Sequence, residues 1–282
     1  MSTVLVSVAT SVVVAALLMT ATALVARRQG RVVVVDIAWG LGFVLAALAC
    51  AVVAVVADAG DALRSGILVA LVTVWGLRLA EHVRRRSTGH TDEDPRYEKV
   101  LGGTLPDVGL AVAVRKVFAV QGLALAVIAL PVSVGMVRDV RWWPVVVAGA
   151  VLWVVGLVFE AVGDAQLAAY RARPRDERPQ VLDTGLWAWS RHPNYFGDAC
   201  VWWGLWLAGG LATGWVAGLA TLVAPIAMTY FLSEATGARL LEKTMMQRPG
   251  YPAYAARTAR FFPGPRVGGT GPPRRARPRV CS

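Results

Sequence analysis

Eight ionisable side chains lie inside or at the ends of strongly apolar segments, and they are the residues whose chemistry stands out. They are Asp36, Arg78, Glu81, His82, Glu160, Asp164, Asp198 and Glu234. A charge at the centre of a membrane-spanning helix costs roughly 2.5–3.5 kcal/mol, so such residues usually bind a ligand or react. Carboxylates, guanidinium groups and imidazoles can transfer protons or hold a polar ligand. These positions are therefore candidates for a catalytic or cofactor-binding site.

The segments that must position these residues are long and apolar. Hydrophobic residues (AVILMFWYC) make up 56% of the 282-residue chain and charged residues only 17%, where about 25% is usual for soluble proteins. Because a bilayer core about 30 Å thick needs about 20 apolar residues per helix, the sequence predicts an all-α polytopic membrane protein. Its seven predicted spans are residues 4–26, 32–57, 67–83, 117–137, 143–162, 196–212 and 215–233.

The distribution of Lys and Arg predicts the orientation of these spans. The connections at 27–31, 84–116 and 171–191 and the segment after 233 carry most of these residues, whereas the intervening connections hold only Arg64, Arg138 and Arg141. The positive-inside rule then places the N-terminus outside and the C-terminus in the cytoplasm, and it explains the net charge of +11 without nucleic acid. All eight ionisable residues fall at cytoplasmic ends. This pattern favours an enzyme that uses a cytosolic reagent over a channel with a polar midplane.

The sequence predicts one membrane domain over residues 1–262, with a C-terminal signature region at about 140–263. Residues 263–282 are rich in Pro, Gly and Arg, and such a composition predicts a disordered basic tail. No CxxC or HExxH spacing is present, so no metal site is predicted. A P-loop and a GxGxxG motif are also absent from the sequence.

The most informative segment is 185–198, which contains Ser-Arg-His-Pro-Asn-Tyr-Phe-Gly-Asp at 190–198. Pro193 ends any preceding helix, and Asn194 and Tyr195 stand where a new span begins. A helix N-terminus at the membrane surface, beside Arg191, favours an anionic group such as a phosphate or carboxylate. A second polar segment, Asp-Pro-Arg-Tyr at 94–97, brings a turn, a guanidinium group and the Tyr97 phenol together. We expect it at the mouth of a polar cavity that the cytoplasmic ends of the spans share.

The 190–198 segment resembles the C-terminal signature of the steroid 5-alpha-reductase-like membrane proteins, and more narrowly of their bacterial branch, long catalogued as a domain of unknown function. Residues 36–43, 75–79 with 94–97, and 242–254 with 261–263 also fit that branch. The resemblance covers about residues 30–263. It implies a seven-helix fold in a bacterial cytoplasmic membrane, with the active site facing the cytoplasm.

The resemblance also implies NADPH-dependent reduction of a carbon–carbon double bond conjugated to a carbonyl. The substrate would be lipid-like: a steroid, polyprenyl or fatty enone. In the family an Asp is followed seven residues later by an Arg, which matches Asp164 and Arg171. The signature Asn matches Asn194, and Asp198 replaces a family Glu. We add Arg175 and Arg191 as cofactor-binding candidates, because cations suit the cofactor's phosphates. We also add Tyr195, which stands beside Asn194 at the predicted helix start.

The chain also departs from the family. The animal enzymes have a His and a Tyr four residues apart in the last helix, where residues 233–243 offer Glu234, Glu242 and Lys243 instead. Their catalytic Glu–Tyr pair has no match by motif. Asp36, Glu81 and Tyr97 are therefore candidates for the group that polarises or protonates the carbonyl.

Two alternatives stay open at the level of sequence. Isoprenylcysteine carboxyl methyltransferases, which use S-adenosylmethionine, resemble the chain through Arg-His-Pro-x-Tyr-x-Gly and through a Glu before Tyr residues, here Glu242, Tyr251 and Tyr254. Asn194 and the acid at 198 favour the reductase, whereas Glu242 favours the methyltransferase. A membrane protein without enzymatic activity is the second alternative.

Overall fold

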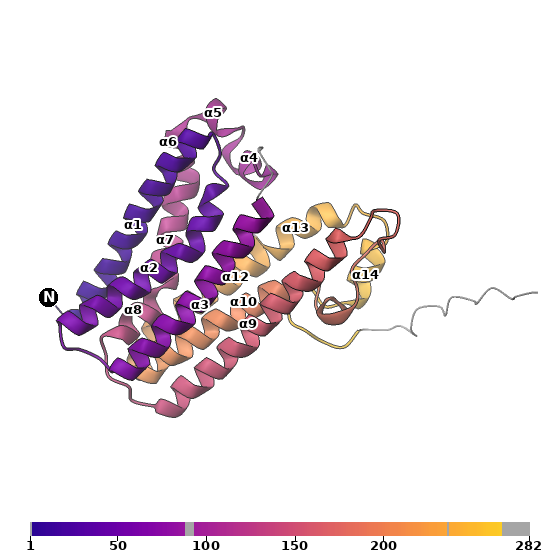
Figure 1. Ribbon diagram of the computed structural model, residues 1–282. Helices are drawn as coiled ribbons and strands as arrows, with labels where there is room; N and C mark the ends of the chain where they lie inside the picture. Colours follow the sequence, from indigo (N-terminus) through magenta and orange to yellow (C-terminus); the bar gives the residue numbers. More distant parts are fainter. Residues whose placement is uncertain (1, 88–92, 236, 267–282) are drawn as a thin grey trace, which may run out of the picture. The chain divides into compact units, whose positions relative to one another are not determined.

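The computed structural model describes residues 2–87, 93–235 and 237–266, and every regular element within these ranges is a helix (Figure 1). The first helices in chain order are α1 (Thr3–Gln29), α2 (Val34–Val56), α3 (Ala62–Ser87), α4 (Pro95–Leu101), α5 (Leu105–Val108), α6 (Leu110–Ala113), the π-helix η1 (Val114–Phe118), α7 (Ala119–Ile128), α8 (Leu130–Met136) and α9 (Trp143–Ala172). Then follow the 3₁₀-helix η2 (Gly185–Ala188), α10 (Pro193–Leu205), the π-helix η3 (Trp206–Gly210), the 3₁₀-helix η4 (Leu211–Thr213), α11 (Trp215–Thr221), α12 (Val223–Tyr230), the π-helix η5 (Phe231–Ala235), α13 (Ala238–Met245) and α14 (Tyr251–Arg257). The all-α prediction is confirmed.

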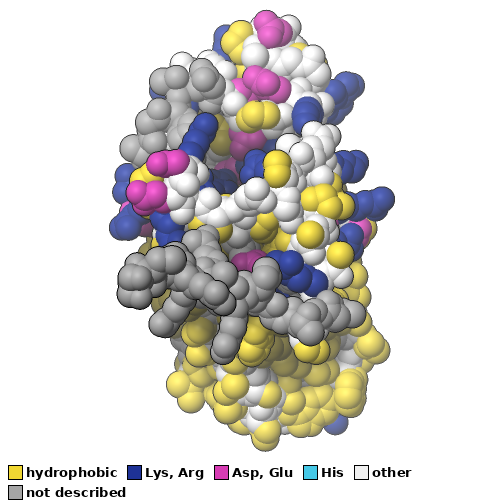
Figure 2. Space-filling view, turned by 90° about the vertical axis from the view of Figure 1, so that its right-hand side faces the viewer, with side chains coloured by type: hydrophobic (Ala, Val, Ile, Leu, Met, Phe, Trp, Pro, Cys, Tyr) yellow, Lys and Arg dark blue, Asp and Glu magenta, His cyan; other side chains and the backbone are white. Residues whose placement is uncertain are grey.

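Six helical stretches in the described part of the chain are long and apolar enough to cross a membrane. They are Thr3–Gln29, Val34–Val56, Ala62–Ser87, Leu110–Ile128, Trp143–Ala172 and Trp215–Met245. Large apolar side chains on them are exposed, for example Leu17 at 66%, Leu123 at 68% and Leu219 at 70%. Leaving such a side chain in water instead of burying it costs about 1.5–3 kcal/mol. The chain is therefore a membrane protein, and on the face drawn in Figure 2 hydrophobic side chains cover one part while charged ones gather in another.

Two of the predicted spans differ from the helices observed. Residues 117–137 form two helices, because α7 ends at Ile128 and α8 starts anew with Pro131 in its first turn, where the missing N–H is tolerated. Residues 196–212 form α10, η3 and η4. This stretch is not one of the six above, and α10 contains the polar residues Asn194 and Asp198.

The described residues divide into two compact units. Unit 1 comprises residues 1–157 and 199–230, and unit 2 comprises 158–198 and 231–282. Residues 267–282, which include most of the predicted disordered tail, lie outside the described residues. The part of the predicted tail that is described is joined to unit 2, where the Gly264 N–H donates to the Trp189 carbonyl at 3.1 Å.

In unit 1, α2 packs closely against both α1 and α3, and these three helices lie side by side in Figure 1. Two glycines allow the closest approach. A Cβ atom on Gly40 would lie 2.5 Å from the Gly76 carbonyl oxygen, and one on Gly76 would lie 2.7 Å from that of Gly40. Any side chain at either position would therefore push α2 and α3 apart, as in the small-residue interfaces of membrane helices.

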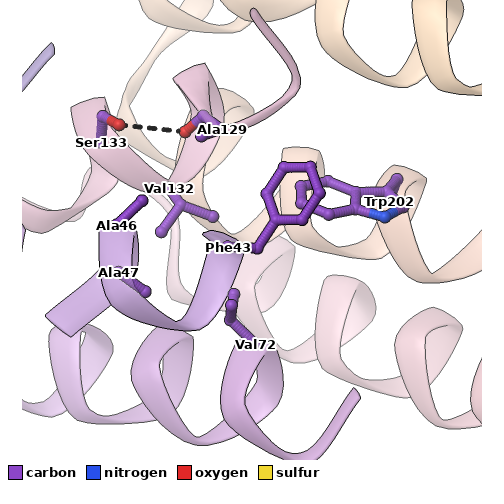
Figure 3. A pocket seen from close by; sticks show the side chains of 8 residues that line it. All are labelled: Phe43, Ala46, Ala47, Val72, Ala129, Val132, Ser133 and Trp202. Atoms are coloured by element: carbon purple, nitrogen blue, oxygen red, sulfur yellow. Dashed lines mark hydrogen bonds between the residues drawn. The ribbon is translucent and has the colours of Figure 1, made fainter. Parts of the chain in front are cut away.

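The core of unit 1 is aromatic. The ring centroids of Phe43 and Trp202 lie 4.4 Å apart, and those of Trp75 and Trp202 lie 5.2 Å apart with the rings nearly perpendicular. Figure 3 shows the gap beside Phe43 and Trp202, which is bounded by small aliphatic side chains and encloses about 180 Å³, none of it wide enough for a water molecule. This region is a packed core, without room for a ligand.

A buried arginine joins the helix ends of unit 1. Arg64 is 0% exposed and donates to the Thr213 hydroxyl at 2.9 Å and to the backbone carbonyls of Gly135 and Arg138. These carbonyls belong to the C-terminal end of α8 and the residues after it, where a cation interacts favourably with the helix dipole. Arg64 thus satisfies carbonyl groups that the helix itself leaves without a donor.

Candidate functional site

Helix α4 presents a phenol and a guanidinium group from the Asp-Pro-Arg-Tyr sequence. The Asp94 carboxylate caps this helix by accepting from the Arg96 backbone N–H at 2.8 Å, and Pro95 occupies the first turn. Gly102 ends the helix in the left-handed conformation, with φ of 88°. The cap at Asp94, Pro95 and Gly102 thus set where α4 begins and ends. Arg96 and Tyr97 lie in its first turn.

Glu93 attaches this segment to the start of α2. Its carboxylate accepts from the backbone N–H groups of Val32 and Val33, the latter at 3.0 Å. Val33 is the N-cap of α2 and makes no side-chain cap of its own. A carboxylate at a helix N-terminus also interacts favourably with the helix dipole. Glu93 therefore serves as the missing cap and holds α4 beside the first turn of α2, where Asp36 lies.

Asp36, Arg96, Tyr97 and Gln121 form one hydrogen-bonded cluster in unit 1, which we call the acid–phenol cluster. The Tyr97 hydroxyl donates to Asp36 Oδ1. Arg96 Nη2 lies 2.9 Å from Asp36 Oδ2 and 2.8 Å from Asp94 Oδ2. From α7, the Gln121 amide donates to the Tyr97 hydroxyl oxygen at 3.2 Å. The structure thus brings together two of the three predicted catalytic residues, Asp36 and Tyr97.

The surroundings of the cluster fix its charges. Burial raises the pKa of Tyr97 well above its ordinary value, and the charge and hydrogen bond of Asp36 raise it further. Burial alone would lower the pKa of Arg96, but its bonds to Asp94 and the charges of Asp36 and Asp94 outweigh burial and raise it. The phenol is therefore protonated and the guanidinium group charged throughout the physiological pH range.

Glu81, the third predicted catalytic residue, makes its ion pairs within α3. Its carboxylate lies 2.6 Å from Arg84 Nε and 2.5 Å from Arg85 Nε, one helical turn away, and its side chain is 39% exposed. Pairs at these spacings are common on exposed helix faces. The contacts of Glu81 are thus those of a solvated helix end.

An apolar groove runs along unit 1 between α1 and the stretch Leu110–Ile128. It has a volume of about 490 Å³, and Met19, Ala23, Phe118 and Gly122 are among the residues that line it. Both walls belong to helices that can cross a membrane. Gly122 directly follows Gln121, whose amide contacts the Tyr97 hydroxyl.

In unit 2, the signature segment places Asn194 at the first turn of α10. The Asn194 side-chain amide donates to Asp164 Oδ1 on α9 at 3.0 Å. Gly163 permits this approach, since a Cβ there would lie 3.2 Å from the Asn194 backbone nitrogen. Asp164 and Asp198 are each only 8% exposed. The structure therefore brings Asp164 and Asn194 together, with Asp198 one turn further along α10.

The other predicted cofactor residues have different surroundings. The Tyr195 ring stacks on the His192 ring, with centroids 5.6 Å apart and planes within 6°. Arg171 and Arg175 are exposed at and after the end of α9. The Arg178 guanidinium group folds the loop back by donating to the carbonyls of Arg171 and Arg173.

Arg191 is engaged inside unit 2. Its guanidinium group lies 2.7 Å from Glu242 Oε1 through Nε and 3.1 Å from Glu242 Oε2 through Nη2. Nη1 donates to the carbonyls of Ala255 and Thr258 at 2.6 and 3.2 Å. His192 Nε2 also lies 3.1 Å from Glu242 Oε1. Arg191 therefore joins the signature segment to α13 and α14.

A family model described as "Protein of unknown function (DUF1295)" matches residues 22–258, which is most of the chain. The chain belongs to this family. No curated protein and no solved structure matches the chain. Membership of the DUF1295 family agrees with the expectation of a domain of unknown function, and the match covers both the acid–phenol cluster and the signature segment.

Sequence reasoning about this DUF1295 protein missed several residues that hold the acid–phenol cluster and the signature segment in place. Glu93 and Gln121 lie in unit 1, and Ser190 lies in unit 2. Glu93 directly precedes the Asp-Pro-Arg-Tyr segment, so its position was a usable signal. Gln121 is a polar residue within an apolar span, and this too could have identified it. Among the described residues no group of three or more His, Cys, Asp or Glu side chains could hold a metal ion.

Proposed function

We propose that this protein is an NADPH-dependent reductase of a carbon–carbon double bond conjugated to a carbonyl, acting on a lipid-like substrate. The observation that carries the proposal is the hydrogen bond from the Tyr97 phenol to Asp36, with Arg96 on the other carboxylate oxygen. The steroid 5-alpha-reductase-like enzymes that the chain resembles use a Glu–Tyr pair, and this acid–phenol pair is its counterpart here.

The cluster suits the chemistry of enone reduction. NADPH, when bound, supplies a hydride for the β-carbon of the enone. The electron pair of the double bond then moves to form an enolate, whose oxygen needs a hydrogen-bond donor. We assign this role to Tyr97, whose raised pKa keeps the phenol protonated. Its single O–H, which donates to Asp36 in this structure, must turn to the enolate oxygen when the substrate is bound. Asp36 and Gln121 orient the hydroxyl. Protonation of the α-carbon by water then completes the reduction.

Unit 2 offers groups that fit the cofactor. An amide needs both a donor and an acceptor, and the partly buried Asn194–Asp164 pair has both kinds of group for the nicotinamide carboxamide. Arg171 and Arg175 are exposed cations suited to phosphate groups. Arg191 is less suited to that role, because Glu242 and two carbonyls already occupy its donors.

The groove between α1 and Leu110–Ile128 supports a lipid-like substrate. Its volume of about 490 Å³ falls within the range of about 300–1,000 Å³ that is typical of small-molecule sites. Its lining is apolar, and both walls can face lipid. A substrate could therefore enter from the membrane with its apolar body in the groove and its carbonyl near Gln121 and Tyr97.

For the topology, we propose that α10 and η3 form a seventh span beside the six apolar stretches. The N-terminus then lies outside. The C-terminus, the acid–phenol cluster and the Asn194–Asp164 pair each lie on the cytoplasmic side of a bacterial cytoplasmic membrane. The support for this arrangement is the alternation of Lys and Arg between successive connections.

Calorimetric titration of the purified full chain with NADPH and with S-adenosylmethionine tests the function. We expect NADPH to bind and S-adenosylmethionine to bind poorly, and we expect Asn194→Ala to weaken NADPH. Tight binding of S-adenosylmethionine without NADPH binding would instead support the methyltransferase. A folded protein that binds neither cofactor would support a role without catalysis.

A further inference from the structure

The turn that leads into α10 is held by a carboxylate from a distant part of the sequence. Glu242, on α13, accepts from Arg191 through both oxygens and also lies 3.1 Å from His192 Nε2. The side chains involved are buried, with exposed fractions of 11% for Arg191, 14% for Glu242 and 3% for His192. Two consecutive residues of the signature segment therefore depend on one carboxylate.

The C-terminal segment adds further bonds to the same turn. The Ser190 hydroxyl donates to the Phe261 carbonyl at 2.8 Å, and the Arg191 backbone N–H donates to the Ala259 carbonyl at 2.9 Å. On α14, the Tyr254 hydroxyl donates to the Trp187 carbonyl at 2.6 Å. In Figure 1, α14 accordingly lies against the loop that precedes α10. These bonds restrain the turn from several sides.

We propose that Glu242 is a positioning residue, which fixes the 190–192 turn through Arg191 and His192 and thereby sets the first turn of α10 and the Asn194 side chain facing Asp164. Its effect on NADPH rests on the proposed function, whereas its effect on the turn does not. Glu242 itself need not touch the cofactor.

The bonds that hold the 190–192 turn depend on the negative charge of Glu242. Arg191 is a nearly buried cation, and removing the carboxylate that binds it leaves that charge without this compensation, which is strongly unfavourable. A Gln at position 242 has the same shape but no charge. An Asp keeps the charge on a shorter side chain, so it should retain much of the attraction to Arg191.

Glu234 supplies a matched control. It is also a carboxylate of unit 2 bonded to arginines, since it pairs with Arg260 and lies 3.5 Å from Arg239. Arg239 and Arg260 both lie outside the 190–194 turn. Glu234→Gln thus removes a comparable charge from the same unit without removing the link to Arg191.

The experiment uses the full chain in lipid nanodiscs and makes two measurements on Glu242→Gln, Glu242→Asp and Glu234→Gln. Hydrogen exchange of the amides at 190–198 reports the turn, and calorimetry reports NADPH affinity. For Glu242→Gln we expect faster exchange at 190–198 and an NADPH Kd raised about ten- to hundredfold, as for a lost hydrogen bond to a charged group. Glu242→Asp should keep most of the slow exchange at 190–198 and most of the NADPH affinity. Glu234→Gln should match the natural protein in both measurements.

The two measurements separate the two proposals. Faster exchange in Glu242→Gln, with no NADPH binding by any form of the chain, would support the positioning role and contradict the reductase. Unchanged exchange at 190–198 in Glu242→Gln would overturn the positioning role. A Kd raised equally by Gln and Asp, with unchanged exchange, would also overturn it, because Glu242 would then contact the cofactor directly.

Discussion

The Tyr97 hydroxyl donates a hydrogen bond to the Asp36 carboxylate across 61 positions of sequence. The bond joins the start of α2 to the first turn of α4, and Arg96 binds the second oxygen of the same carboxylate. The Asp36 side chain therefore orients a phenol whose raised pKa keeps it protonated.

Tyr97→Phe should remove the donor to the enolate oxygen while keeping the aromatic ring. We expect turnover of a conjugated enone to fall by about 10²–10⁴-fold, the usual contribution of a positioned proton donor, with NADPH affinity unchanged. Single-turnover oxidation of NADPH in the presence of the enone measures the effect. Tyr230→Phe, which removes an exposed phenol, is the control. Equal rates for natural protein and Tyr97→Phe would exclude Tyr97 as the donor.

Tyr97 should also make stability depend on pH at the alkaline end. Its pKa in the folded chain is raised, first by burial and then by Asp36, whereas the unfolded value is about 10. The stabilising contribution is therefore complete below about pH 10 and is lost as pH rises through the folded value. The difference in unfolding midpoint between the natural protein and Tyr97→Phe should be constant up to about pH 10 and shrink above it. A difference that grows above pH 10 would contradict the assignment.

Neutralising Arg171 and Arg175 together should weaken NADPH and reduce the salt dependence of its binding. Exposed arginines act on phosphates through charge-assisted bonds that salt screens. Titration of Arg171→Gln/Arg175→Gln at low and high salt measures both effects. Arg138→Gln/Arg141→Gln removes two cations from a connection of unit 1 and should leave binding unchanged. An equal loss of NADPH affinity in both double variants would mean that binding depends only on the net charge of the protein.

A reporter fused to the N-terminus should give an extracytoplasmic signal, and one fused to the C-terminus a cytoplasmic signal. The reason is the bias of Lys and Arg toward alternate connections. Paired fusions of alkaline phosphatase and a fluorescent protein measure both ends. A cytoplasmic signal from both ends would mean an even number of spans and exclude the seventh.

Arg64→Leu should destabilise unit 1 without changing cofactor binding. The substitution leaves the carbonyls of Gly135 and Arg138 and the Thr213 hydroxyl without their buried donor, at about 1–3 kcal/mol for each unsatisfied group. Thermal unfolding in detergent should show a clearly lower midpoint. Arg138→Leu, which removes an exposed side chain, is the control.

Hydropathy predicted the long spans well, because each of them contains a long apolar stretch. Residues 4–26 and 143–162 match α1 and α9, which extend further than predicted. Averaged hydropathy cannot locate interruptions, however. The break before α8 and the π-helical turns η1, η3 and η5 depend on local backbone bonding and on residues such as Pro131 and Gly209.

The sequence singled out candidate residues but did not reveal which residues they bind. Asp36 and Tyr97 were identified separately, but their pairing depends on the docking of α4 through Glu93, which sequence spacing does not reveal. Arg191 was interpreted as a cofactor cation because its neighbours in sequence suit an anion. Its actual partner, Glu242, lies 51 positions away, and only the fold brings these charges together.

Helix α9 carries two of the proposed cofactor residues, Asp164 and Arg171, near its C-terminal end, and it is longer than a membrane core is thick. With 30 residues and a rise of 1.5 Å per residue it is about 45 Å long, whereas the hydrocarbon core is about 30 Å thick. Roughly ten residues must therefore extend beyond the lipid tails, and the end with Asp164 and Arg171 is the polar one. Longer acyl chains would draw this end toward the lipid and shorter ones would expose it. Lipid composition could thus change cofactor affinity without any change in the protein.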